Sequence, residues 1–124
     1  MKSDNNKKAM SSVILAINEF DLLGYEVAVP LDHTSPADLV IKGPTIFDSW
    51  QSVQVKTAYP DRGAMTANVC RTNPTGRTPY TQGEVNLFAI IVEEDVIIIP
   101  CSAVRGKSRV RFKKHGPAGW KLVE

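Results

Sequence analysis

Apolar residues near the start of the chain recur at spacings of three and four. Between residues 5 and 23 the recurring positions are Met10, Val13, Ile14, Ile17 and Phe20. This spacing places their side chains on one face of an α-helix with 3.6 residues per turn. Polar residues 3–5 suit the start of such a helix, and Gly24 suits its end. We therefore predict an amphipathic helix over residues 5–23.

Three short segments after this helix are rich in Val, Ile and aromatic residues, and breakers such as Pro36 and Gly43 separate them. They are residues 25–30, 37–42 and 49–57, which we predict to be three strands of a meander. After a break at residues 60–63, residues 65–71 have the composition of a fourth short strand. Residues 73–83 contain several Pro and Gly residues, so this segment is predicted to be a loop.

Two nearly pure Val/Ile runs follow, at residues 87–92 and 96–100, with three acidic residues between them. This pattern is typical of a hairpin of buried strands. The chain then becomes basic at every second position, namely at Arg105, Lys107, Arg109, Arg111 and Lys113. In a strand these side chains would share one face, with Val110 and Phe112 on the other. Such a row suits contacts with the phosphates of duplex DNA, and it equally suits a solvated face.

The composition is that of one ordinary folded domain spanning residues 1–124, with 43% hydrophobic and 23% charged residues. The net charge of +2 is small, so any nucleic-acid binding must depend on where the basic residues lie. Cys70 and Cys101 are isolated and indicate neither a zinc site nor a disulfide scaffold. No apolar leader or run of about eighteen apolar residues is present, so we expect a cytoplasmic protein with no membrane partner.

One segment combines residue types that suit phosphodiester hydrolysis. Asp38 opens the second predicted strand, while Gln54 and Lys56 lie two positions apart on the third and so share a face. If the two strands pair, a carboxylate, an amide oxygen and an ammonium group converge. Oxygen ligands can hold Mg²⁺, the metal polarises a phosphate and acidifies a bound water, and a lysine offsets the developing charge.

At these residues the sequence resembles the PD-(D/E)xK nuclease superfamily, and within it the group I intron endonuclease branch. The similar pieces follow in order from the first helix to Pro100: residues 23–27 (LGYEV), 29–30 (VP), 36–40 (PADLV), 53–58 (VQVKTA), 85–90 (VNLFAI) and 99–100 (IP). The resemblance implies a restriction-endonuclease-like α/β fold, in which an N-terminal helix precedes a mixed sheet with an additional hairpin. It also implies Mg²⁺-dependent cleavage of double-stranded DNA, with Mn²⁺ as a possible substitute.

The resemblance assigns roles to individual residues. Asp38 and Gln54 would be metal ligands, the Val55 carbonyl a further ligand, and Lys56 the catalytic lysine. Two positions depart from the usual pattern, because Gln54 replaces an acid and the first helix lacks the expected glutamate. The intron branch is known to use this QxK form. Glu19 is the acid inside that helix that would substitute for the missing glutamate.

These residues lead us to expect a metal-dependent DNA endonuclease. A homo-oligomer, dimer or tetramer, is expected because one small domain carries one site and a duplex has two strands. Three alternatives stay open. They are a catalytically degenerate DNA-binding protein of the same fold, a branched-DNA (Holliday junction) resolvase, and a structural or interaction domain with no nucleic-acid role.

Overall fold

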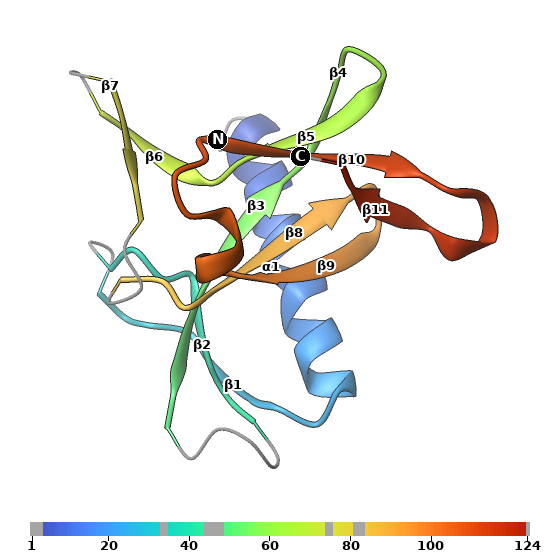
Figure 1. Cartoon of the computed structure of the whole chain (residues 1–124). Helices are drawn as coiled ribbons and strands as arrows, with labels where there is room; N and C mark the ends of the chain where they lie inside the picture. Colours follow the sequence, from blue (N-terminus) through green and yellow to red (C-terminus); the bar gives the residue numbers. More distant parts are fainter. Residues whose placement is uncertain (1–3, 33–34, 44–48, 74–75, 81–83, 124) are drawn as a thin grey trace.

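The computed structural model of the protein describes residues 4–32, 35–43, 49–73, 76–80 and 84–123. The one α-helix among the described residues, α1 (Asp4–Leu22), packs on one face of a five-stranded sheet, and a four-stranded sheet packs on the other (Figure 1). The strands are β1 (Glu26–Ala28), β2 (Leu39–Lys42), β3 (Gln51–Thr57), β4 (Tyr59–Asp61), β5 (Ala64–Asn68), β6 (Cys70–Asn73), β7 (Gly76–Pro79), β8 (Leu87–Val92), β9 (Asp95–Pro100), β10 (Arg109–Lys114) and β11 (Trp120–Leu122). The predicted α/β class, with an N-terminal helix and a mixed sheet, is confirmed.

The five-stranded sheet has the order β1-β2-β3-β8-β9. Neighbouring strands are antiparallel except β3 and β8, which run parallel with Val55 beside Ala89. The predicted meander of the first three strands and the predicted β8–β9 hairpin are both confirmed. The chain between β3 and β8 builds β4 to β7, so β8 can return beside β3 in the same direction.

Helix α1 ends in a Schellman motif at Gly24. The Gly24 N–H donates to the Asp21 carbonyl and the Tyr25 N–H donates to the Phe20 carbonyl, each at 3.0 Å. Gly24 has φ of +89°, which explains why glycine suits this position. Across the described residues, no helix has both the length and the apolar character needed to cross a membrane.

The buried face of α1 differs from the predicted one. Ser12, Ala16 and Phe20 are buried against the sheet, whereas Met10 and Ile14 are about half exposed. Small side chains at two successive turns let the helix backbone approach the sheet closely. The predicted apolar face was therefore placed too far toward the large residues Met10 and Ile14.

The hydrophobic core lies on both faces of the five-stranded sheet. On β8, Ala89 and Ile91 face α1, while Phe88, Ile90 and Val92 pack with the four-stranded sheet. All are almost fully buried. A strand that is covered on both faces needs apolar residues at every position, which accounts for the unbroken run in the sequence.

Two predictions of irregular structure and one strand prediction were wrong in part. The break at residues 60–63 contains the end of β4, and Pro60 is tolerated there because β4 is the edge strand of the order β11-β10-β5-β4. The predicted loop at residues 73–83 includes β7, which pairs with β6 as a two-stranded ribbon. The predicted fourth strand at residues 65–71 is divided between β5 and β6. Strand β11 was not predicted at all.

Candidate active site

Asp38 is fixed to the neighbouring strand by both its backbone and its side chain. It lies one residue before β2, and its N–H donates to the Val53 carbonyl at 2.9 Å. Its Oδ2 accepts a hydrogen bond from the Val55 N–H at 2.9 Å. The carboxylate therefore takes the place of a backbone carbonyl just where the β2–β3 ladder ends. This arrangement holds Asp38 in one orientation.

Gln54 and Lys56 share the sheet face that is turned away from α1. Val53 and Val55 alternate with them and are buried against the helix, so the strand geometry directs Gln54 and Lys56 to the opposite face. The β2–β3 register pairs Leu39 with Val53. Extending it by one position places Asp38 opposite Gln54. The structure thus brings the three residues predicted from sequence to one end of the β2–β3 pair.

Tyr80 completes the surroundings of Lys56. The Lys56 Nζ lies 3.4 Å from the Tyr80 hydroxyl, to which it donates, and 5.2 Å from the centre of its ring. The ring also packs edge-on against Phe88, with ring centres 5.8 Å apart. An ammonium group over an aromatic face is attracted by the ring quadrupole. Sequence reasoning missed Tyr80 because it lies in the segment predicted to be a loop.

The surroundings of Asp38 have opposing effects on its pKa. Burial raises the pKa of this carboxyl, because a charge is less stable away from water, and this effect is the largest. The Val55 N–H and the positive charge of Lys56 act in the opposite direction. The net result is a raised pKa, so Asp38 is a carboxylate whose ionised form is only partly compensated by the protein itself.

The donors around Asp38 fit a hard divalent cation. Asp38 Oδ1 and the Gln54 side-chain amide have no hydrogen-bond partner among the described residues. The Val55 N–H points toward Asp38, and the N–H and C=O of one residue in a strand point to the same side. The Val55 carbonyl therefore faces this end of the pair as well. Within the described residues there is no cluster of three or more His, Cys, Asp or Glu, and no acid is among the groups that shift the pKa of Asp38.

Glu19 is not brought to this cluster. Ser12, not an acid, lies where α1 meets the end of β3, and its Oγ is 2.6 Å from the Thr57 Oγ1. Glu19 follows about two turns later, roughly 10 Å farther along the helix axis. Over the ranges that the structure describes, no contact joins its side chain to Asp38, Gln54 or Lys56. Its substitution for the missing helix acid stays a prediction from sequence.

The predicted basic row is real over only part of its length. On β10, Arg109, Arg111 and Lys113 lie on the face opposite the buried Val110 and Phe112, as predicted. Arg105 and Lys107 lie before the strand, where the turn at Gly106 with φ of +80° ends the short 3-10 helix η1 (Cys101–Val104). The prediction of one continuous row from Arg105 was therefore wrong, because a glycine turn interrupts the strand pattern.

Comparison with known proteins identifies a family. No family model matches the chain. Protein 5.3 of Escherichia phage T7 is 33% identical to it over 106 residues, covering 85% of this chain and 87% of the phage protein. The chain belongs to the protein 5.3 family.

A solved structure shares the fold of this chain, a member of the protein 5.3 family. It is that of a bacterial homing endonuclease, I-Ssp6803I, and the match has a TM-score of 0.75 with 21% sequence identity. The match covers 93% of this chain and 82% of the endonuclease. At this level of identity the likeness establishes the fold, and it agrees with the restriction-endonuclease-like architecture expected from the sequence.

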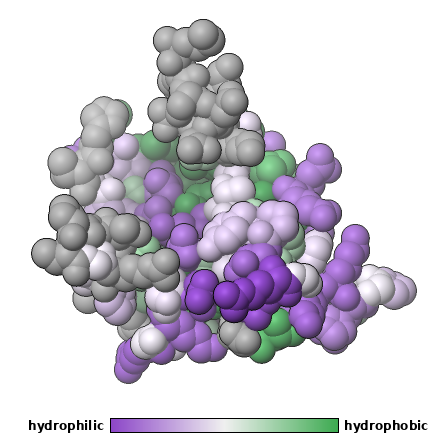
Figure 2. Space-filling model, turned by 90° about the horizontal axis from the view of Figure 1, so that it is seen from above, coloured by the Kyte–Doolittle hydropathy of each residue, from purple (hydrophilic) through white to green (hydrophobic). Residues whose placement is uncertain are grey.

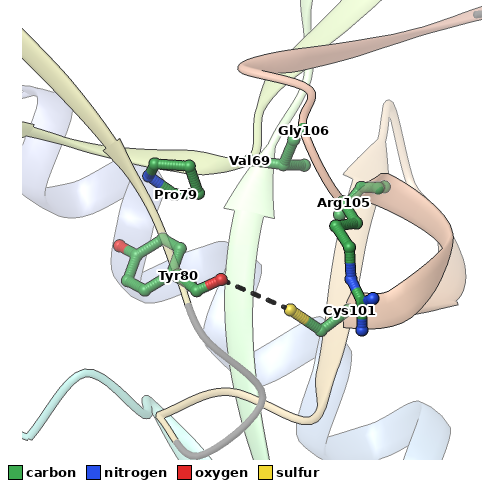
Figure 3. Close-up of a pocket in the computed structure, with 7 residues that line it drawn as sticks. Val69, Pro79, Tyr80, Cys101, Arg105 and Gly106 are labelled. Atoms are coloured by element: carbon green, nitrogen blue, oxygen red, sulfur yellow. Dashed lines mark hydrogen bonds between the residues drawn. The ribbon is translucent and has the colours of Figure 1, made fainter.

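A small cavity of about 160 Å³ lies behind Tyr80 in this member of the protein 5.3 family. Figure 3 shows Cys101 and Arg105 on the side opposite Tyr80, and the Cys101 thiol donates to the Tyr80 carbonyl at 3.7 Å. Burial raises the pKa of the Cys101 thiol; Arg105 opposes the rise and Glu84 adds to it. Tyr80 is thus held at its carbonyl by Cys101 and at its ring by Phe88, which keeps it beneath Lys56.

Proposed function

We propose that this protein is a metal-dependent endonuclease that hydrolyses phosphodiester bonds in double-stranded DNA. The observation that carries the proposal is the meeting of Asp38, Gln54 and Lys56 at one end of the β2–β3 pair. A fold shared with a homing endonuclease supports it. The combination of one fixed carboxylate, one amide oxygen and one ammonium group suits a charged phosphodiester better than a neutral substrate.

Each residue has a defined task in this proposal. Asp38 and Gln54 hold Mg²⁺ or Mn²⁺ through side-chain oxygens, with the Val55 carbonyl as a further ligand. When bound, the cation polarises the phosphate and acidifies a water molecule. Lys56 offsets the negative charge that grows on the phosphate. Tyr80 keeps the Lys56 ammonium in place, and the Val55 N–H keeps the Asp38 carboxylate turned toward the same point.

DNA binding in the proposal depends on the basic C-terminal segment. Arg109, Arg111 and Lys113 share one face of β10, and Arg105 and Lys107 precede the strand. Such side chains bind backbone phosphates without reading the base sequence. We also propose a symmetric homo-oligomer, since a duplex has two strands and each chain has one site.

Cleavage of supercoiled plasmid tests the proposal. With Mg²⁺ or Mn²⁺, wild-type protein should produce nicked and linear forms. Lys56→Ala and Asp38→Ala should lose at least about a hundredfold in rate while staying folded by circular dichroism. Lys42→Gln is the matched control, because Lys42 lies on β2 opposite Glu26 and away from the cluster. Wild-type protein that leaves supercoiled, linear, nicked and branched DNA intact with either metal would overturn the proposal.

Gln54→Glu addresses the metal separately. A second carboxylate should lower the metal concentration needed for half-maximal cleavage, by on the order of tenfold, because ligand charge strengthens binding of a hard cation. An unchanged metal requirement would remove Gln54 from the ligand set. Branched substrates included in the same assays separate a resolvase, which would prefer them to linear duplex.

A degenerate DNA-binding protein is the second candidate function. One observation favours it, namely that Ser12 bonded to Thr57, and not an acid, stands at the α1–β3 contact. DNA binding that weakens with salt, combined with no cleavage under any metal, would select this candidate over the endonuclease.

A further inference from the structure

A second charged feature lies in the four-stranded sheet, on elements other than those that carry Asp38 and Lys56. Asp61 and Arg62 from the β4–β5 turn and Arg109 and Arg111 from β10 line a hollow of about 220 Å³. Figure 2 looks down on the end of the molecule that carries the β4–β5 hairpin. Hydrophilic residues cover much of this face. The hollow brings together two residues from each of two regions that are far apart in sequence.

Arg111 is fixed in this hollow by the turn itself. Its Nη2 donates to the carbonyls of Asp61 and Arg62, each at 3.2 Å. The turn that presents these carbonyls has left-handed backbone at Arg62 (φ +51°) and Gly63 (φ +79°). Arg111 is half-buried, so its guanidinium is held in place before any ligand arrives. A preorganised guanidinium loses less freedom on binding than a free side chain does.

The charges in the hollow are out of balance. Among the described residues that line it, three guanidinium groups face one carboxylate, so this part of the lining is positive overall. Arg62 and Arg109 are exposed, and their side chains make no ion pair with any residue in the described part of the chain. Gathering like charges costs free energy unless an anion accompanies them. Planar guanidinium forks bind the oxygens of phosphate in a bidentate manner.

We propose that this hollow is a binding site for one phosphate group, held by Arg62, Arg109 and Arg111. The site is separate from the cluster at Asp38 and takes only two of the five basic residues predicted from the sequence. The inference rests on the proposed function for the source of the phosphate, which would be the backbone of the bound duplex DNA. A free phosphate compound is the other source of the same chemistry.

The salt dependence of DNA binding tests the site. Binding of a labelled duplex of arbitrary sequence, without divalent metal, would be followed by fluorescence anisotropy from about 50 to about 200 mM salt. Arg62→Gln and Arg109→Gln should each reduce the slope of log affinity against log salt by about 0.9, and the double variant by about twice that. Arg111 is left intact because it holds the turn. Lys42→Gln is the control for loss of one positive charge elsewhere.

Asp61→Asn gives a prediction of the opposite sign in the same hollow. Removing the carboxylate should tighten DNA binding, and the Asp61 carbonyl that holds Arg111 is unaffected. Tighter binding would support the site, whereas unchanged binding in Asp61→Asn together with unchanged slopes in both arginine variants would overturn it.

Inorganic phosphate distinguishes the two sources. In titrations followed by NMR, phosphate should shift the Nε–Hε resonances of Arg62 and Arg109 in wild-type protein. Such shifts in a protein that does not bind DNA would support the phosphate site and assign it to a free phosphate compound. If the protein neither bound DNA nor showed these shifts, the inference would be overturned. Cleavage is measured independently with the Asp38 and Lys56 variants, so either proposal can fail alone.

Discussion

At the scale of single residues, Asp38 combines a fixed position with an unfavourable charge. Its native pKa is raised, chiefly by burial. In the unfolded chain the pKa is lower, so ionised Asp38 opposes folding. This opposition is absent below the unfolded value and fully present above the native value, and stability falls as pH rises between them. A residue that weakens the fold in its working state is expected at a functional site.

Asp38→Asn should therefore separate stability from activity. Asparagine can still accept the Val55 N–H, so the variant should resist urea better than wild type at neutral pH, without metal. The difference should shrink as pH is lowered below both pKa values. Cleavage should be lost under all conditions. Urea unfolding at several pH values measures the first effect, and a variant less stable than wild type at neutral pH would contradict the argument.

Tyr80 should act on Lys56 and not on the metal. Tyr80→Phe removes the hydroxyl acceptor and keeps the ring, so single-turnover cleavage should slow by up to about tenfold. Tyr80→Leu removes the ring face as well and should slow it further. The metal concentration for half-maximal cleavage should stay the same in both variants. A shift in that concentration, with the rate at saturating metal unchanged, would show that Tyr80 does not act through Lys56.

The residues of the candidate site differ in how far sequence could predict them. Asp38, Gln54 and Lys56 follow from strand alternation and from the resemblance of two short segments. Tyr80 could not be predicted, because its contact with Lys56 depends on how β6 and β7 fold back. Arg62 reaches Arg109 and Arg111 only through the pairing of β4, β5 and β10, which no local pattern indicates.

At the scale of elements, segments with strong periodicity were predicted well and those decided by pairing were not. The helix, the first three strands and the β8–β9 hairpin carry their own patterns. Strand β4 contains Pro60, which is unfavourable in a central strand but costs little at an edge. Whether a segment becomes an edge depends on the whole sheet. The same limit applies to β11, whose one strand partner among the described residues is β10.

The end of α1 allows an element-scale prediction. Gly24 has φ of +89°, and a Cβ built there would meet nothing within 4 Å. Gly24→Ala should therefore cost only the backbone strain, about 1 kcal/mol in the free energy of unfolding. Leu31→Ala is the control, since Leu31 is 95% exposed. Urea unfolding with equal m-values measures both, and an unaltered midpoint in Gly24→Ala would mean that the helix end adopts another turn.

At the scale of the whole molecule, the proposal of a homo-oligomer follows from the number of candidate sites that the described residues form. One chain has one candidate site, at one end of the β2–β3 pair, so a single chain can cut one strand at a time. In a symmetric oligomer, two sites can engage the two strands in one encounter. Linear product would then form without accumulation of the nicked form. A monomer would produce nicked DNA first and linear DNA only after a second encounter.

Mixing experiments distinguish these two mechanisms. Wild-type protein would be co-refolded with an excess of Lys56→Ala chains, so that most oligomers contain at most one active site. The product should change from linear to nicked plasmid in proportion to the inactive fraction, because each mixed oligomer cuts only one strand. Light scattering would report the oligomeric state in parallel. If the chains act independently, the inactive chains should only dilute the wild-type protein. Linear and nicked products would then fall together, and their ratio would stay constant.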